Sequence, residues 1–277
     1  MSLAFVPSDA GLLCLQAGVV LAPRAVRPLQ WTRRLHGWGW GLVPIASIVL
    51  VIFAIRFVSD TATGLSYLAL VAVPPLAAGA LAWAIKFPPS RSRAWLGALA
   101  VPLFLIAWLA KDSLSGEAAA ALLSALSCAT LGVLLGMVTP PVWLKAGILL
   151  MAGADVWLVA SDLLQNPNAT LVAAHPPGRL PQLQSETFGS VNMGYGDMFV
   201  AALLGAVLAG DRTRQLRAAL LTLVFAAAFD LLFFVVNELP ATVPVALALI
   251  AVEAYPRRIS ASRRQSKQAD ATPQPAR

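Results

Sequence analysis

The sequence predicts an all-α fold, a polytopic transmembrane helical bundle, and two observations carry this prediction. Hydrophobic residues make up 58% of the 277 residues and charged residues only 12%, whereas a soluble domain has roughly a quarter of its residues charged. Several apolar runs approach or reach about 20 residues, the length of helix that crosses the hydrocarbon core of a bilayer. Backbone polar groups in lipid must be satisfied within helices, and the runs lack the alternating pattern of membrane barrel strands.

The chain divides into about nine such apolar segments when its hydrophobic runs are followed from one end to the other. We expect spans near 3–22, 41–58, 66–85, 94–110, 117–138, 142–164, 190–209, 216–237 and 240–255. The first span is the weakest, because it contains Pro7 and Asp9. We therefore expect a transmembrane helical domain over residues 1–259 and a polar, basic tail over residues 260–277. The composition of this tail favours disorder.

The distribution of basic residues predicts the orientation of these spans. The net charge is +7, and 16 of the 20 Lys and Arg residues fall in the tail and in the loops after the first, third and seventh spans. Because Lys and Arg concentrate on the cytoplasmic side, we expect a cytoplasmic C-terminus and an outer N-terminus in a multi-pass protein of the cell membrane. The positive net charge is thus explained by the basic loops that set the membrane topology, and we expect no nucleic-acid partner. The abundance of Ala, Leu and Arg favours a bacterial source.

Besides Asp9 in the weak first span, four aspartates lie within the predicted spans, where an ionisable residue indicates a function by default. Asp155 lies nine residues before the outer end of the sixth span, and Asp197 lies seven residues into the seventh. At 1.5 Å per residue they are about 13 Å and about 10 Å deep, at nearly the same level of neighbouring helices. We expect these two to face each other. Asp162 is predicted to be a solvated helix-end residue, and Asp230 an acid for packing or pKa tuning.

Two facing carboxyl groups have a chemistry of their own. Like charges a few ångströms apart do not both ionise cheaply, so the two groups share one proton. The ionised member takes a proton from water while the protonated member donates to a carbonyl oxygen, which is the arrangement of aspartic proteases. This chemistry needs no cofactor and no metal, and the sequence predicts neither.

Three short motifs surround the two aspartates. Asp197 closes a Gly-Tyr-Gly-Asp run (194–197), in which the glycines remove side-chain bulk and permit unusual backbone angles. A Pro-Pro break (140–141) leads into the span of Asp155, and a Pro-Ala-Thr-Val-Pro run (240–244) opens the last span on the same outer side. The three elements are therefore expected to converge at one depth.

On these motifs the chain resembles the presenilin and signal-peptide-peptidase family of intramembrane aspartyl proteases, which have nine helices. Order, spacing and span number are similar, and the likeness is clearest over about 131–249, which is under half of the chain. It implies a catalytic half at about 131–255. The site residues that the resemblance implies are the catalytic pair Asp155 and Asp197 and the shaping residues Gly194, Tyr195, Gly196, Pro240 and Ala241.

Three departures from the family pattern concern substrate docking. Ala154 stands where the family has a tyrosine before its first aspartate, and Thr242 stands where it has the leucine of Pro-Ala-Leu. An extra residue also separates Pro240 from Pro244. The predicted orientation, with the tail inside, is similar to signal peptide peptidase rather than presenilin. In the family, this inversion accompanies substrates of opposite membrane orientation.

The resemblance implies transmembrane or signal-peptide-like segments as substrates, met within the lipid bilayer. The carbonyls of a substrate helix are engaged in hydrogen bonds to residues one turn away, so the helix must unwind before attack. Pro240 donates no backbone hydrogen bond. We therefore expect a free backbone edge near Pro240 that pairs with the extended substrate.

Three alternatives stay open. A prepilin-peptidase-like aspartyl protease also has Gly-x-Gly-Asp, but this chain lacks the paired-cysteine module, since it contains only Cys14 and Cys128. The run at 194–197 also matches the selectivity filter of potassium channels, with Asn192 and Met193 where threonine and valine are usual. A non-catalytic membrane protein or transporter would use the acids for proton coupling or packing.

Overall fold

The computed structural model describes residues 7–26, 37–43, 46, 61–85, 94–161, 169–171, 173–174, 180–234 and 239–254. Helices account for most of these residues. The elements in chain order are α1 (Pro7–Leu21), η1 (Trp38–Leu42), α4 (Thr61–Gly79), η2 (Ala80–Ala84), η3 (Ala94–Leu99), α5 (Ala100–Leu109), α6 (Leu114–Val138), α7 (Pro141–Ala160), β1 (Ser185–Phe188), β2 (Val191–Gly194), α9 (Tyr195–Leu208), α10 (Arg212–Phe229), η4 (Asp230–Phe234) and α11 (Val243–Ala254).

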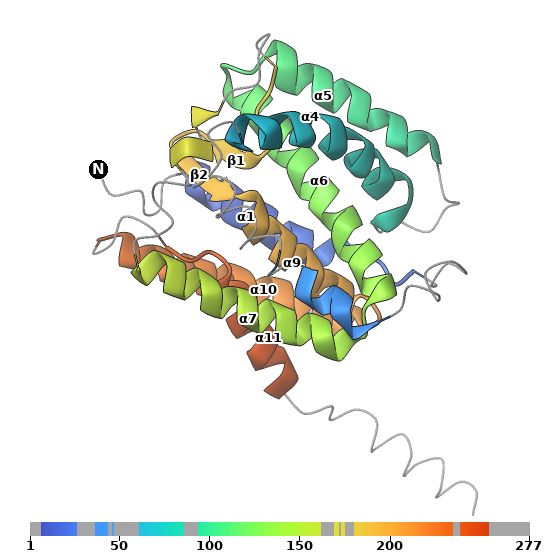
Figure 1. Cartoon of the computed structure of the whole chain (residues 1–277), viewed down its shortest axis with the longest axis vertical. Helices are drawn as coiled ribbons and strands as arrows, with labels where there is room; N and C mark the ends of the chain where they lie inside the picture. Colours follow the sequence, from blue (N-terminus) through green and yellow to red (C-terminus); the bar gives the residue numbers. More distant parts are fainter. Residues whose placement is uncertain are drawn as a thin grey trace, which may run out of the picture.

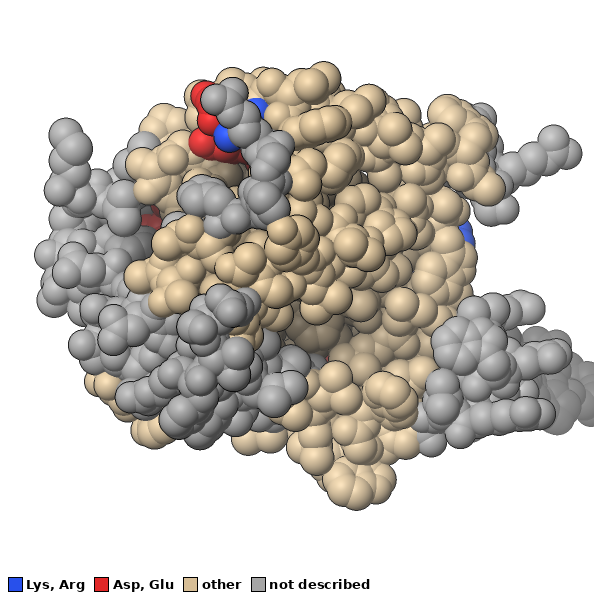
Figure 2. Space-filling view, turned by 45° about the horizontal axis from the view of Figure 1, so that its top comes forward, with Lys and Arg blue, Asp and Glu red and all other residues tan. Residues whose placement is uncertain are grey.

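The prediction of an all-α fold is confirmed in its coarse form, since most of the described residues are helical. Among the described residues, four helices are long and apolar enough to cross a membrane: Thr61–Ala84, Leu114–Val138, Pro141–Ala160 and Arg212–Leu232. Shorter apolar helices accompany them, and most of the predicted second span (41–58) lies outside the described residues. The face in Figure 2 shows few charged side chains on its described atoms. The number of spans stays a prediction.

Helix α6 runs through the middle of the molecule (Figure 1). It packs against α4 and α5 on one side and against α9 on the other. Beyond α9 lie α1 and α10, and then α7 and α11, which contact each other. The larger of the two clusters of buried hydrophobic residues in the described part of the chain fills the space between α1, α6, α7, α9, α10 and α11. The apolar faces that these helices turn inward therefore form one continuous core.

Small residues let α6 and α9 approach closely. A Cβ atom added at Gly132 of α6 would lie 2.8 Å from the backbone oxygen of Ala202 in α9. One turn further along α6, a Cβ atom at Gly136 would lie 3.5 Å from the Cβ of Ala206. Gly132 and Gly136 thus face Ala202 and Ala206 in a pattern of small residues four apart, which allows close helix packing in membranes.

Helix α1, the weakest of the predicted spans, is a central part of the core. Leu12 and Val20 are 1% and 0% exposed, and α1 packs against both α9 and α10. The buried amide of Gln215 in α10 donates hydrogen bonds to the carbonyls of Val20 and Pro23 at 2.9 Å each. These bonds satisfy carbonyls at the end of α1 that have no partner within the helix.

The start of the predicted seventh span is wrong. Residues 190–194 belong to a β-hairpin in which β1 and β2 pair antiparallel, with Phe188 opposite Val191. Gly189 forms the turn with a φ of +61°, a left-handed conformation that glycine adopts at little cost. Helix α9 therefore begins at Tyr195. The depth assigned to Asp197 changes accordingly, because it lies in the first turn of α9 and not seven residues inside a helix.

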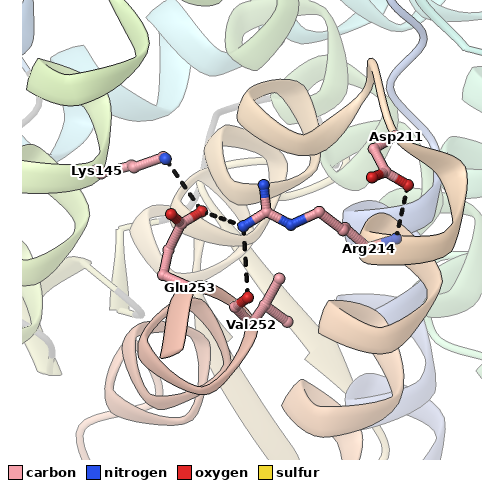
Figure 3. A network of polar contacts seen from close by, with 5 residues as sticks. All are labelled: Lys145, Asp211, Arg214, Val252 and Glu253. Atoms are coloured by element: carbon pink, nitrogen blue, oxygen red, sulfur yellow. Dashed lines mark hydrogen bonds and ion pairs between the residues drawn. The ribbon is translucent and has the colours of Figure 1, made fainter. Parts of the chain in front are cut away.

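Charged residues fasten three helices together at one end of the bundle (Figure 3). Glu253 near the end of α11 forms ion pairs with Lys145 of α7, at 3.0 Å, and with Arg214 of α10. Arg214 also donates to the carbonyl oxygen of Val252 at 3.4 Å, and Asp211 caps α10 by accepting from the backbone amide of Arg214 at 3.1 Å. These contacts tie α7, which carries Asp155, and α11 to α10.

Candidate active site

Asp155 lies on α7, five residues before the helix ends at Ala160. Its Oδ2 accepts a hydrogen bond from Thr242 Oγ1 at 2.6 Å and a longer one from the Thr242 backbone amide at 3.4 Å. Thr242 is buried just before α11 begins at Val243. The departure from the family's Pro-Ala-Leu motif, a threonine in place of leucine, thus supplies a hydroxyl donor to the first aspartate.

Asp197 is the third residue of α9. Its Oδ2 accepts a hydrogen bond from the backbone amide of Gly194 at 3.1 Å, so the carboxyl group satisfies an amide at the start of the helix. A Cβ atom at Gly194 would lie 3.0 Å from this same oxygen, whereas a Cβ atom at Gly196 would meet nothing within 4 Å. Glycine at 194 therefore lets the carboxyl group come close, and glycine at 196 borders open space.

The structure brings the two predicted aspartates together. Helix α7 packs against α9, and the carboxyl group of Asp155 lies near enough to that of Asp197 to influence it electrostatically. Both side chains are half-buried. Each uses Oδ2 for the hydrogen bonds above, and among the described residues no hydrogen bond reaches either Oδ1. The two carboxyl groups thus lie on adjacent helices, each with one oxygen held by hydrogen bonds.

The turn that opens α11 is held in place by α1. Gln16, which is fully buried in α1, donates through Nε2 to the carbonyl oxygen of Ala241 at 3.1 Å. The carbonyl oxygen of Pro240 accepts from the backbone amide of Val243 at 3.1 Å. Residues 240–242 therefore form a turn and not the free extended edge that was expected near Pro240. Gln16 was not among the residues predicted from the sequence, although it is a polar residue inside an apolar segment.

Tyr195 fastens the start of α9 to α6. Its hydroxyl shares a hydrogen bond with Ser127 Oγ at 2.7 Å, and its carbonyl oxygen accepts a weaker one from Cys128 Sγ at 3.7 Å. The ring packs against both hydrophobic clusters of the core. Tyr195 thus shapes the site by positioning the helix turn that carries Asp197.

Glu186 of β1 is an acid beside the site that the sequence analysis missed. It is 0% exposed, and its carboxyl group interacts electrostatically with Asp197. Burial raises the pKa of Glu186 well above its ordinary range, and the neighbouring Asp197 raises it further. The signal available in the sequence was an acid in a short segment of strand-forming residues before a glycine turn.

The two remaining candidate aspartates do not join the pair. Asp162 lies outside the described residues. Asp230, only 4% exposed, follows α10 and faces the carboxyl group of Asp9 in α1. Within the described ranges, no group of three or more His, Cys, Asp or Glu side chains is arranged to hold a metal ion.

Comparisons with protein-family models, with curated proteins and with solved structures find no match to this chain. The candidate site therefore rests on the residues described above: two aspartates on adjacent helices, with a glycine turn, a threonine turn and a third acid around them.

Proposed function

We propose that this protein is an intramembrane aspartyl endopeptidase that hydrolyses peptide bonds in transmembrane or signal-peptide-like segments. The observation that carries the proposal is the pairing of Asp155 and Asp197 across α7 and α9, with one oxygen of each free of hydrogen bonds from the described residues. A water molecule between these free oxygens would lose a proton to the ionised aspartate. The other aspartate would donate its proton to the substrate carbonyl oxygen while the water oxygen bonds to the carbonyl carbon. The proton taken from water would then pass to the amide nitrogen, which leaves as an amine when the C–N bond breaks.

The surroundings of each aspartate support distinct positioning roles. Thr242 fixes the orientation of the Asp155 carboxyl group through two hydrogen bonds. Gly194 does the same for Asp197 through one, at the start of a helix whose free amides stabilise negative charge. Open space at Gly196 supplies room for substrate backbone beside Asp197. The hairpin strand β2 leads directly into this turn and offers extended backbone with which an unwound substrate can pair.

The selectivity-filter alternative is less well supported. Tyr195, Gly196 and Asp197 are helical, so their carbonyl oxygens point along the helix toward amides one turn ahead. A filter requires such oxygens to line a pore and replace the water around an ion. The prepilin-peptidase-like alternative shares the aspartyl chemistry and differs in its substrate.

The proposal is tested with purified protein in liposomes and a panel of membrane-span peptides inserted in both orientations. We expect the wild type to cut at least one peptide, and we expect Asp155→Asn and Asp197→Asn to lose cleavage. The temperature of thermal unfolding of both variants should stay close to that of the wild type. Asp112→Asn, at an acid whose side chain is 87% exposed, is the matched control and should cut normally. Cleavage that persists in either aspartate variant removes that residue from the mechanism.

A further inference from the structure

Glu186 is a buried acid that the proposed chemistry leaves unused. Both of its carboxyl oxygens are inaccessible to solvent and have no hydrogen-bond partner from another described residue. The ion pairs found in the described part of the chain do not include it. Burying an acid without a partner is costly, and an apolar side chain would fill the same space more cheaply.

The groups that face Glu186 all belong to the candidate site or adjoin it. The titratable ones are Asp197 and Tyr195 of α9 and Cys128 of α6. Strand β1 also packs against α1 and pairs with β2, but no titratable group of these two elements is found to interact with Glu186. The acid therefore shares its environment with one member of the aspartate pair, and no described cation balances its charge.

The hairpin fixes where this acid lies. Glu186 of β1 is paired with Met193 of β2, and the next pair, Ser185 with Gly194, is the last before α9 begins. Gly194 in turn donates its amide to the Asp197 carboxyl group. The position of Glu186 relative to Asp197 is thus set by backbone hydrogen bonds over only a few residues.

We propose that Glu186 is a positioning residue that acts through Asp197, a third acid whose ionisation controls how many protons the Asp155–Asp197 pair retains. The inference rests on the proposed function, because it concerns the pH range over which the pair is active. While Glu186 is neutral, the pair behaves as an isolated dyad that shares one proton. When Glu186 ionises, its negative charge opposes removal of that last proton. The pair then keeps its working protonation state to a higher pH.

The raised pKa of Glu186, caused first by burial and then by Asp197, places this ionisation above the ordinary range of a glutamate, about 4.3. A neutral side chain of the same shape at position 186 lacks the negative charge that Glu186 gains when it ionises. It should therefore end activity at a lower pH and leave the acidic limb of the profile in place.

The first experiment compares pH profiles of peptide cleavage for the wild type, Glu186→Gln, Glu186→Asp and Glu117→Gln in liposomes. We expect the alkaline limb of Glu186→Gln to move down by about one pH unit or more, since a unit charge within about 12 Å shifts a pKa by at least about one unit at an effective dielectric constant of about 20. Glu186→Asp keeps an acid at this position and should restore part of the alkaline range.

Glu117→Gln is the matched control for effects on the hairpin. Glu117 of α6 accepts a hydrogen bond from the turn amide of Gly189 at 2.7 Å, so it supports the same hairpin without a described interaction with Asp197. We expect its pH profile to coincide with that of the wild type. An alkaline limb that does not move in Glu186→Gln, or that moves equally in Glu117→Gln, overturns the proposed role of Glu186.

A second experiment separates failure of this inference from failure of the proposed function. A group whose pKa is raised on folding contributes stability that is present below its unfolded pKa and is lost as pH rises through its folded pKa. The temperature of thermal unfolding in detergent should therefore fall with rising pH in the wild type, and it should fall less in Glu186→Gln.

The coupling between Glu186 and Asp197 is measured by the same pH dependence of thermal unfolding, which does not require that any peptide be cleaved. Asp197→Asn removes one titrating acid in any background, so coupling appears as a difference: we expect the pH at which stability falls to shift by a different amount in the wild-type background than in the Glu186→Gln background. If no peptide is cut but this difference appears, the protease proposal fails and the coupling between the two acids stands. If Asp197→Asn acts equally in both backgrounds, the coupling is absent and the inference about Glu186 is overturned.

Discussion

At the scale of single residues, the hydrogen bonds from Thr242 determine how the carboxyl group of Asp155 is oriented in the candidate site. Thr242 is 3% exposed, and its hydroxyl lies 2.6 Å from Asp155 Oδ2. A hydrogen bond to a charged acceptor contributes about 1.5–3 kcal/mol. The threonine is thus expected to orient the carboxyl group as well as to fill space.

We predict that Thr242→Val lowers the rate of cleavage by roughly tenfold to hundredfold, because valine has nearly the same shape but no hydroxyl donor, and each 1.36 kcal/mol of barrier is tenfold in rate. Thr242→Ser keeps the donor and should retain most of the activity. Both variants are compared with the wild type by single-turnover cleavage of one membrane-span peptide. Equal rates for the valine and serine variants would show that the hydroxyl has no part in the reaction.

At the scale of elements, the packing of α6 against α9 determines where Asp197 lies. Gly132 and Gly136 face Ala202 and Ala206 across this interface, and α9 begins with the turn that carries Asp197. Van der Waals contact between small residues is the main attraction between helices in lipid. A methyl group at the tightest point of the interface must therefore separate the two backbones.

We predict that Gly132→Ala destabilises the protein by about 1–3 kcal/mol, the cost of overpacking a well-packed core. Its added Cβ would lie only 2.8 Å from a backbone oxygen, which cannot move as a side chain does. Gly136→Ala is the control on the same helix face, since its Cβ would meet only ordinary contact at 3.5 Å. Thermal unfolding in detergent checks both. A Gly136→Ala variant as unstable as Gly132→Ala would contradict the steric explanation.

At the scale of the whole molecule, polar groups gather at the two ends of the bundle. Glu253, Lys145 and Arg214 join three helices at one end (Figure 3). Lys111 and Asp112 form an ion pair at 3.7 Å in the turn before α6 begins. Helix α6 is 25 residues long, so its two ends are roughly 37 Å apart. This length separates the two polar ends by about the thickness of a bilayer.

We predict that the end with Lys145 and Arg214 faces the cytoplasm, because most Lys and Arg residues lie in the loops on that side and in the tail. In intact bacterial cells, a membrane-impermeant maleimide should label Asp112→Cys. It should label Ser260→Cys only after lysis, and the wild type serves as the control for Cys14 and Cys128. The reverse pattern of labelling would place the tail outside and invert the topology.

The sequence alone predicted the features that depend on composition and on neighbours along the chain. Long apolar runs with few charges predict helices in lipid, and the described helices match eight of the predicted segments, with boundaries shifted by a few residues. The positions of Asp155 and Asp197 in adjacent segments also led to the expectation that they meet. The helix boundary before Asp197 was missed, because a short hairpin gives a weak signal beside a long apolar run.

Only the tertiary structure decided which groups surround the two aspartates. Asp155 and Thr242 are 87 residues apart in the chain, and Gln16 and Ala241 are 225 apart. Glu186 is 58 residues from the thiol of Cys128 that it faces. The periodicity and hydropathy of a segment indicate whether it is surrounded by lipid or by water. They do not specify which helices become neighbours, since that depends on packing between side chains brought together by the fold. The acids in the sequence thus suggest aspartyl chemistry, while the threonine, glutamine and glutamate around them are known only from the folded chain.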